Sequence, residues 1–195
     1  MDRDVLYRGL SKAGWAYLFL YLDFNLNLGS SHLGLLPEWA GYVLLHQAIG
    51  LLEGEERDLG LLRSLCVLLG GWSGLVWLAS IAGVSAPFAL AAPPALVVQV
   101  LGLYFHFQFF TDLAGLARRY QPPDMALDRR LLRLRTVQVL LNTALFAMTL
   151  LPLREGEPAG WLFVGGVLVN AVVGLCLMCG VFALRKCFLP VEEGG

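Results

Sequence analysis

Six long apolar segments divide this sequence and constrain its fold more than any other feature. A helix needs about 20 apolar residues to cross a bilayer, with about 17 as the lower limit. The last four segments exceed this length, the first two are marginal, and the second is the shortest. We therefore predict an all-α, polytopic membrane helix bundle with six transmembrane segments in a single domain, residues 1–195. The segments cover approximately residues 12–28, 37–52, 59–84, 93–117, 131–151 and 160–184.

The composition agrees with a membrane protein and excludes two other classes. Of the 195 residues, 57% are hydrophobic and only 15% are charged, which is too apolar for an ordinary soluble domain. The formal net charge of -1 leaves no excess of basic residues for the face that a nucleic-acid-binding protein needs. The lipid bilayer is therefore the first expected partner, and nucleic acid is not an expected one.

The positions of the basic residues predict the orientation of the bundle. With the N-terminus inside and every segment crossing, the cytoplasmic regions are 1–12, 53–63, 118–135 and 185–195. These regions contain all of the 14 Lys and Arg residues except Arg154. Because cytoplasmic loops are enriched in Lys and Arg, we predict that both termini are cytoplasmic.

Polar side chains interrupt most of the apolar segments at a similar depth. At about 1.5 Å per helical residue, they are expected in the middle third of a hydrocarbon core about 30 Å thick. An acid at this depth is costly and usually faces the protein interior. We therefore predict a shared midplane site for a small polar or cationic solute. Its expected residues are Asp23, Asn25, Asn27, His46, His106, Asn142 and Asn170.

Small residues support an inward orientation for three of these polar positions. A small residue on the same helix face as a polar one is typical of close helix contact rather than of lipid exposure. The shared faces are Tyr42, His46 and Gly50; Gln99, Gly102 and His106; and Gly166, Asn170 and Gly174.

The same residues also have structural interpretations. Asn142 and Asn170 can hydrogen-bond to neighbouring helices, each contributing about 0.6 kcal/mol. His46 and His106 can be satisfied core histidines. For Asp23 the sequence leaves two roles open, a site for a cation or proton and a structural partner for a histidine.

Few features of the sequence indicate an enzyme. Cys176 and Cys179 form a C-x-x-C pair, but they lie in an apolar segment without the nearby charge that activates a redox thiol. Two histidines could ligate a haem, and Asp23, His46 and His106 could supply three metal ligands. A membrane-embedded metal or haem protein is therefore our third hypothesis, and the cofactor stays open.

A basic stretch, Arg129 to Arg135, precedes the fifth apolar segment. Its simplest role is to contact anionic lipid headgroups. The wider loop, Arg118 to Arg135, is a candidate docking surface for a protein partner. Near this end of the fourth segment, Asp112 is expected to pair with Arg118 or Arg119.

One stretch carries a resemblance to known proteins. Residues 21–42 read YLDFNLNLGSSHLGLLPEWAGY, an Asp-x-Asn helix, a Gly/Ser turn and a second helix opened by Leu-Leu-Pro. Over residues 21–54 the chain resembles a group of small bacterial integral membrane proteins, which implies a multi-pass protein of the bacterial cytoplasmic (inner) membrane. That group has no assigned activity, so the resemblance carries over no catalytic residues.

A second likeness concerns architecture alone. The six-segment layout is similar to that of the substrate-binding subunits of energy-coupling-factor transporters. Those subunits usually carry an A-x-x-x-A pattern in the first helix, whereas this chain has Ala13 and Ala16 at a different spacing.

The sequence thus supports two main hypotheses of function. The first is a small-solute transporter or solute-capture protein that uses the midplane polar site. The second is a structural or assembly protein whose polar layer only sets helix packing.

Overall fold

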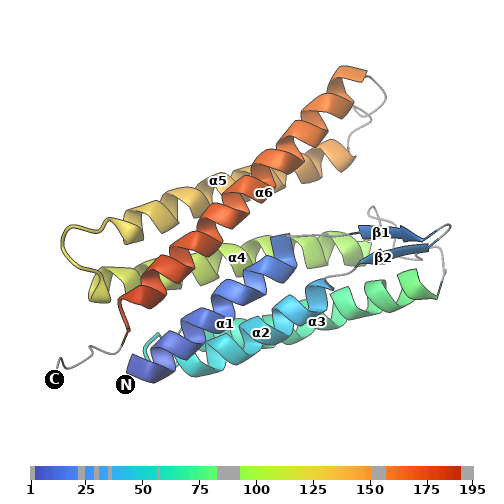
Figure 1. Cartoon of the computed structure of the whole chain (residues 1–195). Helices are drawn as coiled ribbons and strands as arrows, with labels where there is room; N and C mark the ends of the chain where they lie inside the picture. The colour runs from blue at the N-terminus through green and yellow to red at the C-terminus, as the bar shows by residue number, and fades with distance from the viewer. Residues whose placement is uncertain are drawn as a thin grey trace.

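The computed structural model describes residues 3–21, 25–28, 31–34, 37–56, 58–82, 93–150 and 157–189. These residues form six helices and one two-stranded antiparallel sheet (Figure 1). The elements are α1 (Arg3–Tyr21), β1 (Asn25–Leu28), β2 (Ser31–Gly34), α2 (Glu38–Leu52), α3 (Leu59–Ile81), α4 (Pro93–Tyr120), α5 (Leu127–Leu150) and α6 (Glu157–Lys186).

The helices are arranged as a closed ring in chain order. Each helix contacts the next one along the chain, and α6 returns to contact α1. The start of α1 and the end of α6 lie at the same end of the bundle (Figure 1), where Arg185 donates a hydrogen bond of 3.1 Å to the Ser11 hydroxyl. The β1–β2 hairpin lies at the opposite end (Figure 1).

The prediction of a helical bundle with membrane-spanning helices is confirmed at this level. Among the described residues, α3, α4, α5 and α6 are long and apolar enough to cross a membrane. Large apolar side chains on their outer faces are exposed, including Leu61, Leu75, Val97, Leu140 and Leu168. Extended exposed apolar surface of this kind is typical of contact with lipid.

The first two helices differ from the other four. The first turns of α1 carry Arg3, Asp4, Arg8 and Lys12, and α2 has only 15 residues. Neither is among the helices that are long and apolar enough to span. Both are nevertheless integral to the ring, because α1 contacts α2 and α6, and α2 contacts α3.

One predicted helix was wrong at its C-terminal end. We expected a helix over residues 12–28, but α1 ends at Tyr21, and Asn25–Leu28 forms β1, paired with β2 in the register Leu28 opposite Ser31. The sequence Asn-Leu-Asn-Leu alternates with a period of two, which suits a strand, and Asn is a poor helix former. Asn25 and Asn27 therefore belong to the hairpin and not to a membrane helix.

Small residues let α1 approach its neighbours closely. An added Cβ at Gly41 of α2 would lie 3.0 Å from the backbone oxygen of Ala16, and one at Gly14 would lie 2.8 Å from the Phe182 ring. Such small-residue contacts are the usual way in which membrane helices gain van der Waals packing. They seat α1 between α2 and α6.

Ion pairs join the helices at the end of the bundle where the chain termini lie, which we call the charged end (Figure 1). Arg119 lies 2.7 Å from Glu56, Arg63 lies 3.4 Å from Glu53, and Arg118 lies 3.7 Å from Asp128. The expected pairing of Asp112 with Arg118 or Arg119 was therefore wrong. Its carboxylate instead accepts a hydrogen bond of 2.8 Å from Gln108, one helical turn away.

The contact between α1 and α6 generates a test of the fold. An added Cβ at Gly174 would lie 2.5 Å from Cγ of Tyr21, whereas one at Gly165 on the same helix would meet nothing within 4 Å. We expect Gly174→Ala to lower the free energy of unfolding by about 1–3 kcal/mol through overpacking. Gly165→Ala, the matched control, should raise it by up to about 1 kcal/mol through helix propensity. Thermal unfolding in detergent measures both, and a Gly174→Ala variant at least as stable as the wild type would contradict the close approach of Tyr21 to Gly174.

Candidate functional site

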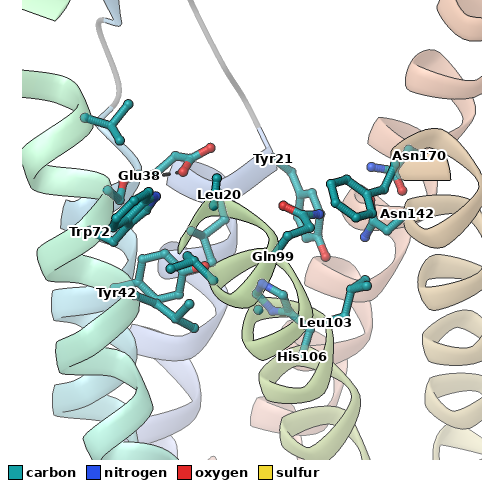
Figure 2. Close-up of a pocket in the computed structure, with 17 residues that line it drawn as sticks. Leu20, Tyr21, Glu38, Tyr42, Trp72, Gln99, Leu103, His106, Asn142 and Asn170 are labelled. Atoms are coloured by element: carbon teal, nitrogen blue, oxygen red, sulfur yellow. Dashed lines mark hydrogen bonds between the residues drawn. The ribbon is translucent and has the colours of Figure 1, made fainter. Parts of the chain in front are cut away.

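A cavity of about 550 Å³ lies inside the ring, in the half of the bundle that is nearer the hairpin. Each of the helices α1 to α6 contributes to its wall (Figure 2). The polar residues of the wall are Tyr21, Glu38, Tyr42, Trp72, Ser73, Gln99, His106, Asn142 and Asn170.

Aromatic side chains close the inner end of the cavity. Tyr17, Phe105, Phe109 and Phe110 are fully buried, and the Tyr17 ring centroid lies 4.9 Å from that of Phe110. The Tyr17 hydroxyl also lies 3.1 Å from Nδ1 of His106, at hydrogen-bonding distance. This aromatic layer joins α1 to α4 across the ring and separates the cavity from the charged end of the bundle.

Amide side chains form one side of the cavity. Figure 2 shows Asn142 and Asn170 on the far side of Tyr21 and Gln99 from Trp72. Behind them Gln138, which is 1% exposed, donates a hydrogen bond of 2.9 Å to the side-chain oxygen of Asn170. The side-chain oxygen of Gln138, Oε1, is buried and has no hydrogen-bond partner among the described residues.

The carboxylate in the cavity wall, that of Glu38, lies at the end nearer the hairpin. Glu38 is the first residue of α2, and its carboxylate accepts a hydrogen bond of 3.4 Å from Ser73 of α3 (Figure 2). Glu38 is exposed, whereas Tyr42, one turn further along α2, is buried. The wall thus runs from an exposed acid at the hairpin end to a closed aromatic floor.

The structure brings together three of the residues that the sequence singled out. His106, Asn142 and Asn170 line the same cavity, and so do Gln99 and Gly102 from the predicted face of α4. The Gly166–Asn170–Gly174 face is also a contact face, since added Cβ atoms at its two glycines would meet Leu145 and Tyr21. The substrate-binding role of these residues stays a prediction.

The other predicted residues are placed differently. His46 is not among the residues that line the cavity, and its Nε2 accepts a hydrogen bond of 3.2 Å from Arg63, which also pairs with Glu53. The expectation that His46 joins the polar layer was therefore wrong. Asn25 and Asn27 lie in β1, and Asp23 lies outside the described residues.

Sequence reasoning missed Glu38, Tyr21 and Gln138. The signal for Glu38 was available, because an acid directly after Pro37 marks the first turn of a helix, and a helix end can face an internal cavity. Gln138 lies one helical turn before Asn142, on the same side of α5. Tyr21 carried no signal beyond its position at the end of an apolar segment.

The described residues offer no site for a metal. Within them, no group of three or more His, Cys, Asp or Glu side chains is arranged to hold an ion. His46 and His106 have separate partners, Arg63 and Tyr17, so the two imidazoles do not form one ligand pair. Cys176 and Cys179 are free thiols.

The cavity wall can recognise a ligand through hydrogen bonds and one negative charge. Gln99, Asn142 and Asn170 each present both an amide donor and a carbonyl acceptor. Glu38, when it is ionised, adds hydrogen-bond acceptors and no donor. Such a wall suits a small molecule that carries hydrogen-bond donors and a positive charge.

Comparisons with known proteins do not indicate what the cavity binds. No family model, no curated protein and no solved structure matches the chain.

The Gln138–Asn170 hydrogen bond can be tested by a double-mutant cycle. A cycle of Gln138→Leu, Asn170→Leu and the double variant should show a favourable coupling of about 0.6 kcal/mol, the mean for such bonds in membrane proteins. Thermal or denaturant unfolding in mixed micelles measures it.

Thr143 supplies the control for this cycle. Its hydroxyl donates to the Val139 carbonyl of its own helix, so Thr143→Val and Asn170→Leu should be additive within about 0.5 kcal/mol. Equal coupling energies in both cycles would contradict the assigned bond.

Proposed function

We propose that this chain is an integral membrane protein that binds a small polar solute in the cavity, as a transporter or a solute-capture protein. The observation that carries this proposal is that polar side chains from every helix of the ring line one cavity. Polar groups inside a membrane protein are costly and usually mark a pathway or binding site. A ligand in this shared cavity could bind several of these groups at once, which favours a binding site.

The chemistry of the wall supports a cationic, hydrogen-bond-donating solute. In the proposed complex, Glu38 faces the positive group, and the amides of Gln99, Asn142 and Asn170 bind the remaining polar atoms. His106 would hold the inner end of the ligand, because Tyr17 already orients its ring. Asp23, proposed from the sequence as a second acid, would add to the same preference.

A structural role is the second candidate, and specific contacts favour it. Gln138 donates a hydrogen bond to Asn170 between α5 and α6, and the Tyr17 hydroxyl lies at hydrogen-bonding distance from His106 between α1 and α4. Bonds of this kind fix helix register without any ligand. The two candidates differ in one measurable respect, since only the first predicts solute binding that depends on Glu38.

We test the first candidate with Glu38→Gln. The variant keeps the size and much of the hydrogen bonding of Glu38 but removes its charge. We expect small organic ammonium and guanidinium ions to stabilise the wild type, and Glu38→Gln to weaken that binding by about tenfold to a hundredfold, the usual cost of losing a charged hydrogen bond. Thermal shift in detergent across a concentration series measures the affinity.

Glu53→Gln is the matched control. It removes the same charge at the other end of α2, where Glu53 pairs with Arg63. Its solute affinity should equal that of the wild type. If no solute of the panel stabilises the wild type, or if both variants lose binding equally, the structural candidate is favoured.

We further propose that all six helices cross the bacterial cytoplasmic membrane, with both termini in the cytoplasm. The support is the grouping of basic residues at one end and the placement of α1 and α2 within the ring. The stretch Arg118–Arg135, which runs from the end of α4 to the start of α5 on the same side, keeps its proposed role as a docking surface for a protein partner.

Cysteine labelling tests this topology. In a background without the four native cysteines, single cysteines at Ser31 and Glu155 should react with an impermeant thiol reagent in intact cells. Cysteines at Arg57 and Asp124 should react only after permeabilisation. Labelling of Arg57→Cys from outside would show that α2 does not cross.

A further inference from the structure

A second cavity, separate from the solute site, lies at the charged end of the bundle. It is a groove of about 710 Å³ between the start of α5 and the end of α6. Its basic residues are Arg129, Arg130 and Arg133, and its apolar residues are Met125, Ala126, Leu127, Leu134 and Ala183. It shares no lining residue with the solute cavity.

The three arginines of the groove differ from the other arginines nearby. Arg118 pairs with Asp128, Arg119 pairs with Glu56, and Arg135 donates to Thr111 at 2.6 Å and lies over the Phe107 ring. The side chains of the groove arginines, in contrast, have no ion pair or hydrogen bond within the described part of the chain. Within the basic stretch, Arg135 therefore bonds to another helix, whereas the other three arginines line the groove.

The spacing of these arginines concentrates positive charge on one helix face. Arg133 follows Arg130 by three residues and Arg129 by four, so the three side chains are neighbours on the surface of α5. Like charges at these spacings repel one another and destabilise a helix. An anion in the groove would remove this repulsion, and guanidinium groups bind phosphate through paired hydrogen bonds.

The apolar residues of the groove indicate which kind of anion it can bind. Leu127 is buried, while Leu134 and Ala183 are half-buried beside the arginines. The groove also lies where two of the candidate membrane helices, α5 and α6, begin and end. A molecule that fits has a phosphate at the membrane boundary and hydrocarbon that continues along the helices.

We propose that the groove binds the phosphate headgroup of an anionic phospholipid, with its acyl chains against α5 and α6. Basic pockets between membrane helices bind anionic headgroups in this way. Free phosphate shares the headgroup chemistry, but it would make no use of the apolar wall. The proposal does not depend on the solute site.

Short-chain lipids allow a direct test in detergent. We expect dihexanoyl-phosphatidylglycerol to stabilise the full-length protein at lower concentrations than dihexanoyl-phosphatidylcholine. Inorganic phosphate should have little effect. Arg129→Gln/Arg133→Gln should weaken phosphatidylglycerol binding by about thirtyfold, because each basic residue near an anionic lipid contributes about a factor of five. Thermal shift gives the apparent affinity, and native mass spectrometry gives the number of lipids bound.

Arg3→Gln/Arg8→Gln is the matched control. It removes two exposed positive charges from α1 at the same end of the bundle, and it should leave phosphatidylglycerol binding within about twofold of the wild type, since long-range charge is screened. Where the α5 double variant does not fold, Arg130→Gln alone, with an expected loss of about fivefold, decides the question.

Three results would overturn the proposal. Equal stabilisation by the two lipids would show that the groove does not recognise the charge. Equal losses in the α5 and α1 variants would show that only net charge matters. A phosphate response as large as the phosphatidylglycerol response would assign the groove to a free anion.

Discussion

The packing of Tyr17 against α4 sets the distance between two helices that face each other across the ring. Its ring is fully buried, stacks on Tyr21 with centroids 5.5 Å apart, and contacts Phe109 and Phe110. Its hydroxyl reaches His106. Aromatic side chains carry large buried surfaces with defined geometry, so this contact joins α1 to α4 firmly. The helices are held together at this layer. Beyond it, side chains fill the space between the helices less completely, and this leaves the cavity.

The membrane gives the polar residues of the bundle their significance. In water, an amide or imidazole on a helix surface costs little, but in a bilayer it needs a partner from the protein or a ligand. Gln138 and Asn170 meet part of this demand through one hydrogen bond, and Oε1 of Gln138 has no partner among the described residues. Gln99 and Asn142 line a shared cavity with Glu38, which accepts a hydrogen bond from Ser73. At the charged end of the bundle, Arg63, Arg118 and Arg119 form ion pairs, whereas the groove arginines Arg129, Arg130 and Arg133 form none among the described residues.

Particular residues show how far prediction from sequence reached. The starts of α2, α3 and α4 lie within a residue of the predicted segments, because Pro37 and the Pro93–Pro94 pair are clear helix starts, as is the beginning of the apolar run at Leu59. Asn142, Asn170 and His106 line one cavity, and their binding role stays a prediction. The prediction for His46 was wrong, because depth along a helix does not say which neighbour a side chain faces. Glu38 was missed because the search for polar residues favoured the middle of each segment over its end.

The sequence by itself determined that this chain forms apolar helices of membrane-spanning length, and approximately where most of them begin and end. Those properties are local, since run length, proline positions and backbone hydrogen bonding act within one segment. Only the tertiary structure decided which faces meet, that α1 gives way to a hairpin after Tyr21, and that His46 bonds to Arg63 instead of lining the cavity. Helix rotation decides these contacts, and it depends on small residues such as Gly14, Gly41 and Gly174 matching large ones on other helices.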